Sequence, residues 1–185
     1  MPAGIRKRIR GKTGDIRITE IARFDSSFDS LWEKASVSFG IIIRRDSAYL
    51  NWRFVDQPCR EYKIFKAFRK ENGDPEGYIV LREGRSRGLK SGIITDIFAS
   101  GSDPDILISL IDFAISFFAK RDDVALIRCD MLSRDVGKAL KAHGFVKIHS
   151  SDRFMFTKVG NGIDADYIAD PGNWFLDYSD SDLDL

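Results

Sequence analysis

A strongly apolar segment between two strand-like runs constrains the fold of this chain more than any other feature. Residues 105–120 carry apolar side chains over a broad helical face, and the flanking runs 92–99 and 124–130 are rich in branched residues that favour strands. A helix that joins neighbouring strands makes them parallel, and such a connection is nearly always right-handed. The sequence therefore predicts a partly parallel α/β sheet with this helix packed against it.

Shorter patterns predict the other elements. Alternating apolar residues favour strands, apolar residues three and four apart favour helices, and Asp46, Asp103 and Ser133 are suitable N-caps. The predicted strands are 16–21, 62–69, 77–82, 92–99, 124–130, 145–148 and 153–159, and the last two are expected to form a closing pair. The predicted helices are 27–38, a segment from Asp46 to the Gln57-Pro58 pair, 105–120, and a segment from Ser133 to Gly144.

The 185 residues of the chain suit one domain between two charged ends. We divide it into a flexible basic lead (1–15), a body (16–159) and an acidic C-terminal tail (160–185) that Trp174 and Phe175 anchor. Charged ends of this kind are usually solvated. Attraction between the two ends, or an anionic partner for the lead, is the alternative.

Composition argues against several classes of function. A formal net charge of +1 gives no surplus of cations for non-specific nucleic-acid binding. Cys59 and Cys129 lie far apart without metal-ligand spacing, so we expect two buried thiols in a reducing compartment. No apolar run approaches the roughly 20 residues that span a bilayer, and the basic start lacks the apolar core of a secretory signal. We expect a cytoplasmic protein without a nucleic-acid or membrane partner.

The succession of strands and helices over residues 77–145 resembles the acyl-CoA-binding half of the GNAT acetyltransferase superfamily, and the resemblance extends over residues 16–159. It implies a central mixed sheet flanked by helices, an acetyl-CoA or other acyl-CoA co-substrate, and an amine of a small molecule or sugar as the acceptor. The strand 92–99 would splay from its neighbour. The donor-binding residues implied by the resemblance are Ile97, Phe98 and Ala99 for the pantetheine arm, Gly101 and Ser102 in the pyrophosphate loop, and Ser133.

Two motifs depart from the pattern of the superfamily. The loop that should follow the form Q/R-x-x-G-x-G/A reads Ser-Gly-Ser-Asp-Pro-Asp over 100–105, so Asp103 and Asp105 bring negative charge to a helix end that should meet an anion. We expect Asp103 to act as an ordinary N-cap. In the last helix, Leu140 stands where a tyrosine commonly protonates the departing thiolate, and Ser133 stands where asparagine is common. Two interpretations stay open, an acyltransferase and a binding or assembly module without catalysis.

Acyl transfer to an amine needs a base that takes the ammonium proton. Asp96 and Asp130 are the candidate catalytic carboxylates, because each lies near the end of one of two neighbouring parallel strands, where a crevice opens. Capping or plain solvent exposure is the alternative for both. His143 is expected to be a helix-end residue, favourable at the negative end of the helix dipole, with a role as the base as the alternative.

A last pattern concerns the acceptor and the partners. Tyr49, Trp52 and Arg53 are candidate acceptor-binding residues, because the helices after the first strand border that site in the superfamily, whereas packing within the fold is the alternative. The stretch 45–53, together with the ending 174–182, is similar to the GNAT-like C-terminal half of some longer bacterial proteins. That similarity implies a partner GNAT domain, and an edge strand leaves a homodimer as a further alternative.

Overall fold

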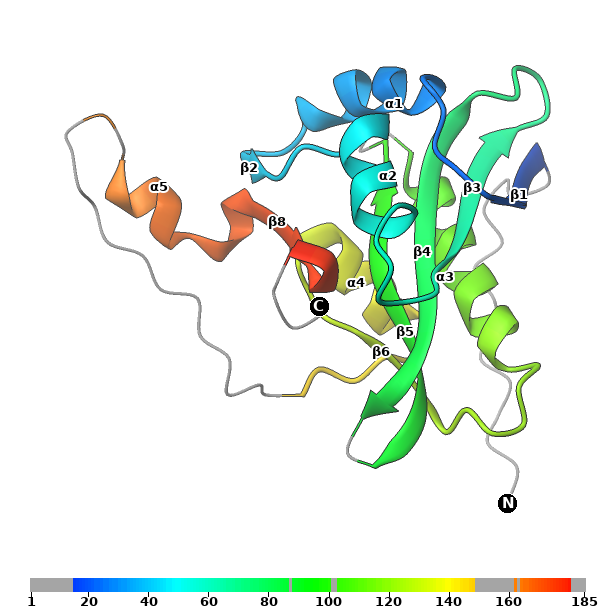
Figure 1. Ribbon diagram of the computed structural model, residues 1–185. Coiled ribbons are helices and arrows are strands. Elements are labelled where there is room, and N and C mark those ends of the chain that lie inside the picture. The colour runs from blue at the N-terminus through cyan, green and yellow to red at the C-terminus, as the bar shows by residue number, and fades with distance from the viewer. Residues whose placement is uncertain (1–14, 87, 101–102, 149–161, 163, 181–185) are drawn as a thin grey trace.

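The computed structural model describes residues 15–86, 88–100, 103–148, 162 and 164–180 (Figure 1). A five-stranded sheet in the order β1-β3-β4-β5-β6 forms the centre of the molecule. Its strands are β1 (Ile16–Ile21), β3 (Lys63–Arg69), β4 (Pro75–Ser86), β5 (Leu89–Ala99) and β6 (Leu126–Cys129). Within this sheet the β5–β6 pair is parallel and the other pairs are antiparallel, so the predicted mixed and partly parallel α/β sheet is confirmed.

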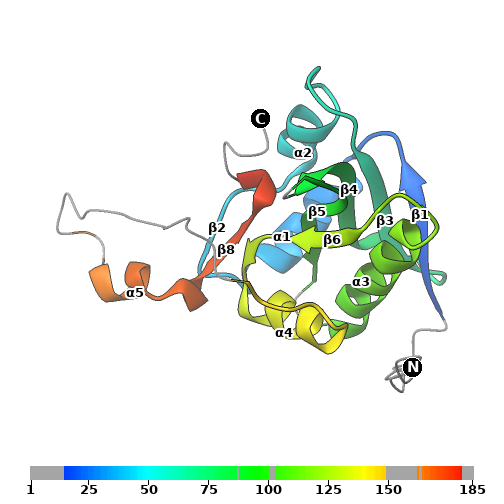
Figure 2. The same cartoon turned by 90° about the horizontal axis from the view of Figure 1, so that it is seen from below.

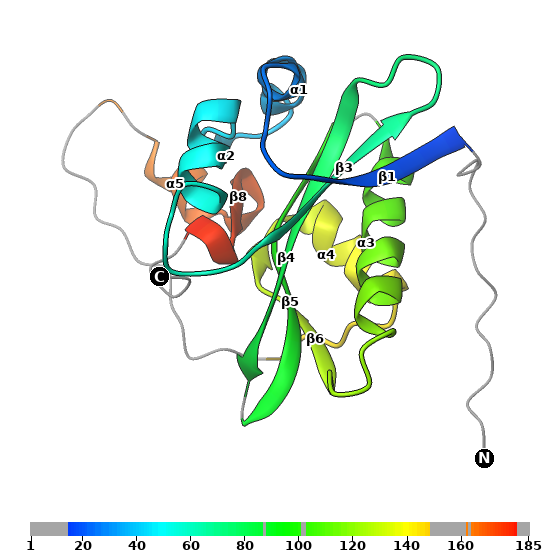
Figure 3. The same cartoon turned by 45° about the vertical axis from the view of Figure 1, so that its right-hand side comes forward.

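Helices cover both faces of this sheet. The helices α1 (Ser27–Ser36) and α2 (Ser47–Phe54) lie on one face, and α3 (Pro104–Phe118) packs on the other beside α4 (Arg134–Ala142) (Figures 2 and 3). Two glycines let α3 approach closely. A Cβ at Gly77 would lie 2.7 Å from Ile106, and one at Gly92 would lie 2.5 Å from the ring of Phe118. The central strands fill the core, where Tyr78 to Leu81 are fully buried.

A second, three-stranded sheet joins segments that are far apart in the sequence. Its order is β2-β8-β7, with β2 (Ile41–Ile42), β7 (Met131–Leu132) and β8 (Trp174–Asp177), and the short helical segments α5 (Ala165–Ala169), η2 (Pro171–Asn173) and η3 (Tyr178–Asp180) flank β8. Phe175 anchors this segment with an exposed fraction of 2%. The side chains of Asp177 and Asp180, which we expected to be solvated, are buried at 2% exposure each, because they bind a buried arginine.

Two local predictions were wrong. Residues 145–148 form no strand, because none of the described strands pairs with them, and the side chains of Val146 and Ile148 lie exposed. Their predicted partner, 153–159, lies outside the described residues. Cys59 is exposed rather than buried, and neither cysteine is in a disulfide. Within the described ranges, no helix has the length and apolar character to cross a membrane.

Candidate functional site

The two parallel strands of the central sheet separate halfway along β5, as the resemblance implied. β5 pairs with β6 from Ser91 opposite Leu126 to Ile94 opposite Cys129. Beyond that point β5 continues to Ala99, whereas the chain after β6 turns away as β7 and pairs with β8. Residues 95–99 of β5 therefore have β4 on one side and no strand of the described chain on the other. We call this side the open edge.

A bulge in β5 decides which backbone groups face the open edge. The register with β4 shifts beside Thr95, which leaves Thr95 without a residue opposite it. Before the bulge, the carbonyl of Lys90 accepts a hydrogen bond from Ala125 on the β6 side, at 2.9 Å. After it, the N–H of Ser100 donates to the carbonyl of Glu76 on the β4 side, at 3.0 Å.

Backbone polar groups of successive strand residues point to alternate edges, so the groups of Ile97 and Ala99 face the open edge. Those of Asp96 and Phe98 face β4. Of the three residues expected to hold a pantetheine arm, Ile97 and Ala99 thus have suitable donors and acceptors. Phe98 is instead a core aromatic in contact with Trp32 and Tyr78.

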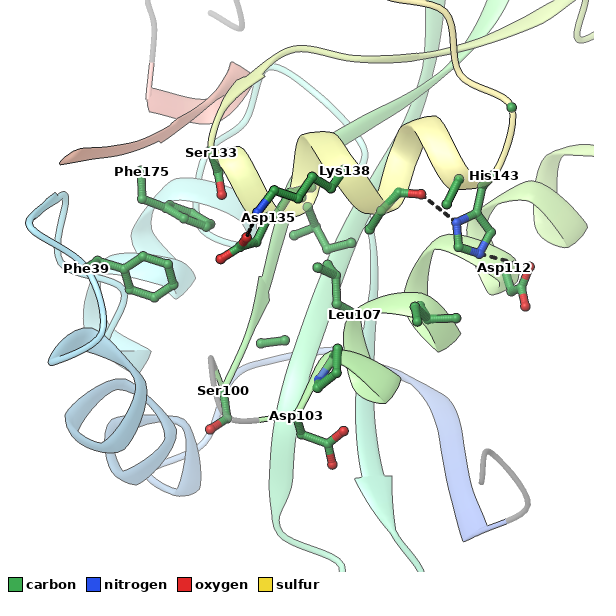
Figure 4. Close-up of a pocket in the computed structure, with 18 residues that line it drawn as sticks. Phe39, Ser100, Asp103, Leu107, Asp112, Ser133, Asp135, Lys138, His143 and Phe175 are labelled. Carbon is green, nitrogen blue, oxygen red and sulfur yellow. Dashed lines mark hydrogen bonds and ion pairs between the residues drawn. The ribbon is translucent and has the colours of Figure 1, made fainter. Parts of the chain in front are cut away.

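A cavity of about 770 Å³ lies between α3, α4 and the open edge (Figure 4). Its walls are largely apolar. They include Ile97, Ala99, Leu107, Val136, Phe39 and Phe175. A volume of this size suits a small-molecule ligand, for which pockets of about 300–1,000 Å³ are typical.

Charged and polar side chains lie around this cavity. Asp135 pairs with Lys138 at 3.0 Å, and Ser133 lines the cavity at the start of α4 without a capping hydrogen bond from its hydroxyl. His143 is the C-cap residue of α4, as expected, and its Nδ1 lies 2.6 Å from the carbonyl oxygen of Ala139. Nε2 of the same ring lies 3.5 Å from Asp112.

The N-terminus of α3 is occupied by a carboxylate of the chain itself. Asp103 Oδ1 accepts a hydrogen bond from the Asp105 N–H at 2.9 Å, so Asp103 is the N-cap that the sequence predicted. Its Oδ2 binds Arg69, and this hydrogen bond raises the pKa of the guanidinium. Arg69 also lies 3.3 Å from Glu76. Gly101 and Ser102 lie outside the described residues.

These contacts test the fit of an acyl-CoA. The open edge and the apolar walls suit the thioester and the pantetheine arm, which needs backbone partners and apolar surface. The described end of α3 does not suit a diphosphate for two reasons. Asp103 already accepts the hydrogen bond of the backbone amide that such an anion would meet. In addition, Glu76 and Asp103 neutralise the charge of Arg69.

The two candidate carboxylates lie in different surroundings. Asp96 is fully buried, 3.3 Å from Nε of Arg45, and accepts a hydrogen bond from the hydroxyl of Tyr78 at 2.9 Å. It does not line the cavity, and neither does Asp130. Asp130 lies between β6 and β7, forms an ion pair with Arg128, and has a side chain that is 42% exposed.

Asp96 belongs to a buried cluster that draws on three distant segments. Arg45 Nη2 also donates to Asp177 at 3.1 Å and to Asp180 at 2.6 Å, and we call Arg45, Asp96, Asp177 and Asp180 the Arg45 cluster. Burial raises the pKa of Asp177 well above its ordinary value, and the nearby Asp96 carboxylate raises it further. Burial raises the pKa of Asp180 as well. Three carboxylates around one guanidinium favour the retention of a proton.

The predicted acceptor residues line no part of the cavity. Trp52 is 65% exposed on α2, and its ring centroid lies 5.7 Å from that of Tyr49. Burial raises the pKa of Tyr49 to about 12. Arg53 is buried and donates from Nε to the carbonyl of Ser179 at 2.9 Å, so it holds the C-terminal segment.

Sequence reasoning predicted Phe175 as an anchor but did not place Phe39 or Phe175 at the cavity, and it missed the buried cluster around Arg45. Phe39 and Phe175 come from loop and tail segments that carry no periodic pattern. One signal was present, since the stretch 45–53 and the ending 174–182 stood out together, and the structure joins them through Arg45 and Arg53. The described residues contain no group of three or more His, Cys, Asp or Glu side chains that could hold a metal ion.

Neither a protein-family model nor a curated protein matches the sequence. Solved structures do match it. An aminoglycoside acetyltransferase from an uncultured soil metagenomic sample, in complex with sisomicin, has a TM-score of 0.53 at 13% identity over 79% of this chain and 98% of its own. A ribosomal-protein-alanine N-acetyltransferase from Brucella melitensis biovar Abortus 2308 has a TM-score of 0.52 at 16% identity, over 77% and 99%. Glucosamine-6-phosphate N-acetyltransferase from Arabidopsis thaliana has a TM-score of 0.52 at 10% identity, over 77% and 99%.

Proposed function

Because this chain has the fold of the GNAT superfamily, we propose that it is an acyltransferase that moves an acyl group from a thioester to an amine of a small molecule or sugar. The observation that carries the proposal is the cavity at the open edge of β5, where the polar backbone groups of Ile97 and Ala99 meet apolar walls. The acetyltransferase names of the structural neighbours agree with this chemistry, and the complex with sisomicin favours a small-molecule acceptor.

In this proposal the open edge positions the donor. The amides of a pantetheine arm would pair with the backbone of Ile97 and Ala99, much as an added strand pairs with a sheet edge. The amine then attacks the thioester carbon, so that a C–N bond forms, the C–S bond breaks, and the thiolate departs while the ammonium loses a proton. Alignment of the two reactants accounts for much of the rate in such a reaction.

The described residues differ in the roles that they can have in this reaction. The hydroxyl of Ser133 lines the cavity and makes no capping hydrogen bond, so we propose it as a donor-binding group near the departing sulfur. Leu140 is buried and has no proton to give. Asp96 is held by Arg45 and Tyr78 inside the protein, and we propose a structural role for it, which leaves the more exposed Asp130 as the candidate base.

Calorimetric titration with acetyl-CoA and with acetyl-pantetheine tests this function. Acetyl-pantetheine has the thioester arm but no diphosphate, so we expect comparable affinities for the two compounds. The substitution Ala99→Pro removes an N–H that faces the open edge and leaves the β4 ladder in place. It should abolish binding of both compounds in a protein that still unfolds cooperatively. Absence of binding to either compound in the native protein would overturn the proposal.

A binding or assembly module without catalysis is the second candidate function. Leu140 in place of a proton donor and Asp103 at the α3 terminus favour it. Turnover measured with a panel of amines, including aminoglycosides and amino sugars, separates the two candidates. Thioester binding without turnover of any amine would favour the module, which would then act with a partner domain or as a homodimer.

A further inference from the structure

Two phenylalanines line the cavity beside the open edge. Phe39 lies between α1 and β2, Phe175 lies in β8, and their ring centroids are 4.7 Å apart. We call this pair the aromatic wall. Phe98, which separates Ile97 from Ala99 in β5, has its ring centroid 5.7 Å from that of Phe39 and 5.8 Å from that of Phe175. The aromatic wall and the open edge therefore border the same end of the cavity.

The opposite end of the cavity has a different character. Figure 4 shows Phe39 and Phe175 on one side of the cavity, and His143 with Asp112 on the other. The aromatic rings of the cavity lie at the first end, with Ser133 and Asp135 on the same side, whereas the far end offers an imidazole and a carboxylate. Because the aromatic wall borders the open edge, the acyl group of a thioester arm that pairs with Ile97 and Ala99 would lie next to this wall.

The aromatic wall is held in place from several directions. β8 is the middle strand of its sheet, with β2 on one side and β7 on the other, so both backbone edges around Phe175 are paired. The guanidinium carbon of Arg45 lies 4.9 Å from the centroid of the Phe175 ring. The same guanidinium binds Asp177, two residues farther along, and Asp180. Phe175 itself is 2% exposed, so its ring is enclosed by protein on the sides that do not face the cavity.

We propose that Phe175 determines the acyl-chain specificity of this site by limiting it to short acyl groups such as acetyl. The inference rests on the proposed function, because it concerns the acyl end of the same donor. A longer chain would have to displace a ring that is packed against Phe39 and Phe98 and backed by Arg45. A smaller side chain at position 175 leaves an apolar space at the point where the acyl chain ends. A longer acyl chain that fills this space buries more apolar surface and therefore binds more tightly.

The test is a set of titrations with acetyl-, butyryl- and octanoyl-pantetheine by calorimetry. The native protein should bind acetyl-pantetheine about tenfold tighter than octanoyl-pantetheine, or more. Phe175→Ala should reverse this preference by about the same factor, since each buried methylene adds apolar contact. Phe175→Leu keeps most of the apolar volume and should accept butyryl but not octanoyl chains, so it supplies the answer if the alanine variant does not fold.

Phe113→Ala is the matched control. Phe113 packs against Phe65 and Phe117 with ring centroids 4.6 and 6.0 Å away and does not line the cavity, so its removal should leave the chain-length preference unchanged. An unchanged preference in both Phe175 variants, or equal affinity of the native protein for acetyl and octanoyl chains, would overturn the inference while the proposed function stood. A native protein that bound no thioester at all would overturn both.

Discussion

At the scale of single residues, Asp103 shows how one side chain alters a binding site. Its carboxylate caps α3 through Asp105 and pairs with Arg69, so an anion-binding helix end is already filled. Asp177 shows the same principle in the interior, where Ser179 donates to its Oδ1 and Arg45 to its Oδ2. In both places a carboxylate of the chain itself accepts the hydrogen bonds of neighbouring donors.

Asp103→Ser should raise the affinity for acetyl-CoA by about three- to tenfold at low salt, because serine keeps the cap while the negative charge at the helix end is lost. Removal of that charge also leaves Arg69 paired with Glu76, 3.3 Å away. Calorimetry with acetyl-CoA and acetyl-pantetheine measures the effect. The affinity for acetyl-pantetheine should not change, and an equal gain for both compounds would show that the diphosphate is not involved. Asp112→Asn, which alters another carboxylate of the cavity, is the control.

Asp177 makes the stability of the protein depend on pH. Its pKa is raised in the folded state by burial and by Asp96, so the folded protein binds a proton more tightly there than the unfolded chain does. The contribution of this carboxyl to stability is therefore fully present below its unfolded pKa and is lost as the pH rises through the folded pKa. Asp180 shifts in the same direction.

Comparison of the native protein with Asp177→Asn by urea unfolding between pH 4.5 and 8 measures this dependence. Asparagine retains an acceptor for Ser179 but does not titrate. We expect the free energy of unfolding of the native protein, relative to the variant, to decrease as the pH rises. A relative increase with pH would contradict the raised pKa.

At the scale of elements, the described fold follows the sequence wherever signals are local. Helix α3 has its Asp103 cap, Pro104 in the first turn and a broad apolar face, and it forms close to where these predict. The prediction of a strand over 145–148 was wrong, because a strand needs a paired neighbour and none of the described strands pairs with this segment. The bulge at Thr95 was equally invisible in the sequence, although it decides that Ile97 and Ala99 face the open edge.

Close packing of α3 on the sheet gives a prediction with an internal control. Gly92→Ala should destabilise the protein by about 1–3 kcal/mol, because a Cβ there would lie 2.5 Å from the ring of Phe118. Gly137→Ala lies in α4 with no atom within 4 Å of the new Cβ, so it should stabilise by about 0.5–1 kcal/mol. Thermal and urea unfolding of both variants checks this, and equal effects of the two would mean that α3 can shift away from the sheet.

At the scale of the whole molecule, the Arg45 cluster connects regions that are distant in the sequence. Arg45 precedes α2, Asp96 lies in β5, and Asp177 and Asp180 lie near the C-terminal end of the described chain. The sequence indicated the two patterns that contain Arg45 and the tail aspartates, but their contact could not be derived, since ion pairing across more than 130 positions depends on the completed fold. The acidic composition of the tail predicted solvent-exposed aspartates, because composition alone does not reveal a buried partner such as Arg45.

Arg45→Met tests whether this cluster holds the C-terminal segment and, with it, the aromatic wall. Methionine fills much of the apolar space of the arginine stem but leaves three buried carboxylates without their guanidinium, which should cost about 3–5 kcal/mol of stability. Arg44→Met is the matched control, because Arg44 is 72% exposed and pairs with the N-cap residue Asp46, so it should change stability by less than about 1 kcal/mol. Limited proteolysis provides the spatial readout. If the cluster secures β8, the Arg45 variant should be cleaved faster than the Arg44 variant within residues 164–180, whereas faster cleavage spread evenly over the chain would mean that Arg45 supports the fold as a whole rather than this segment.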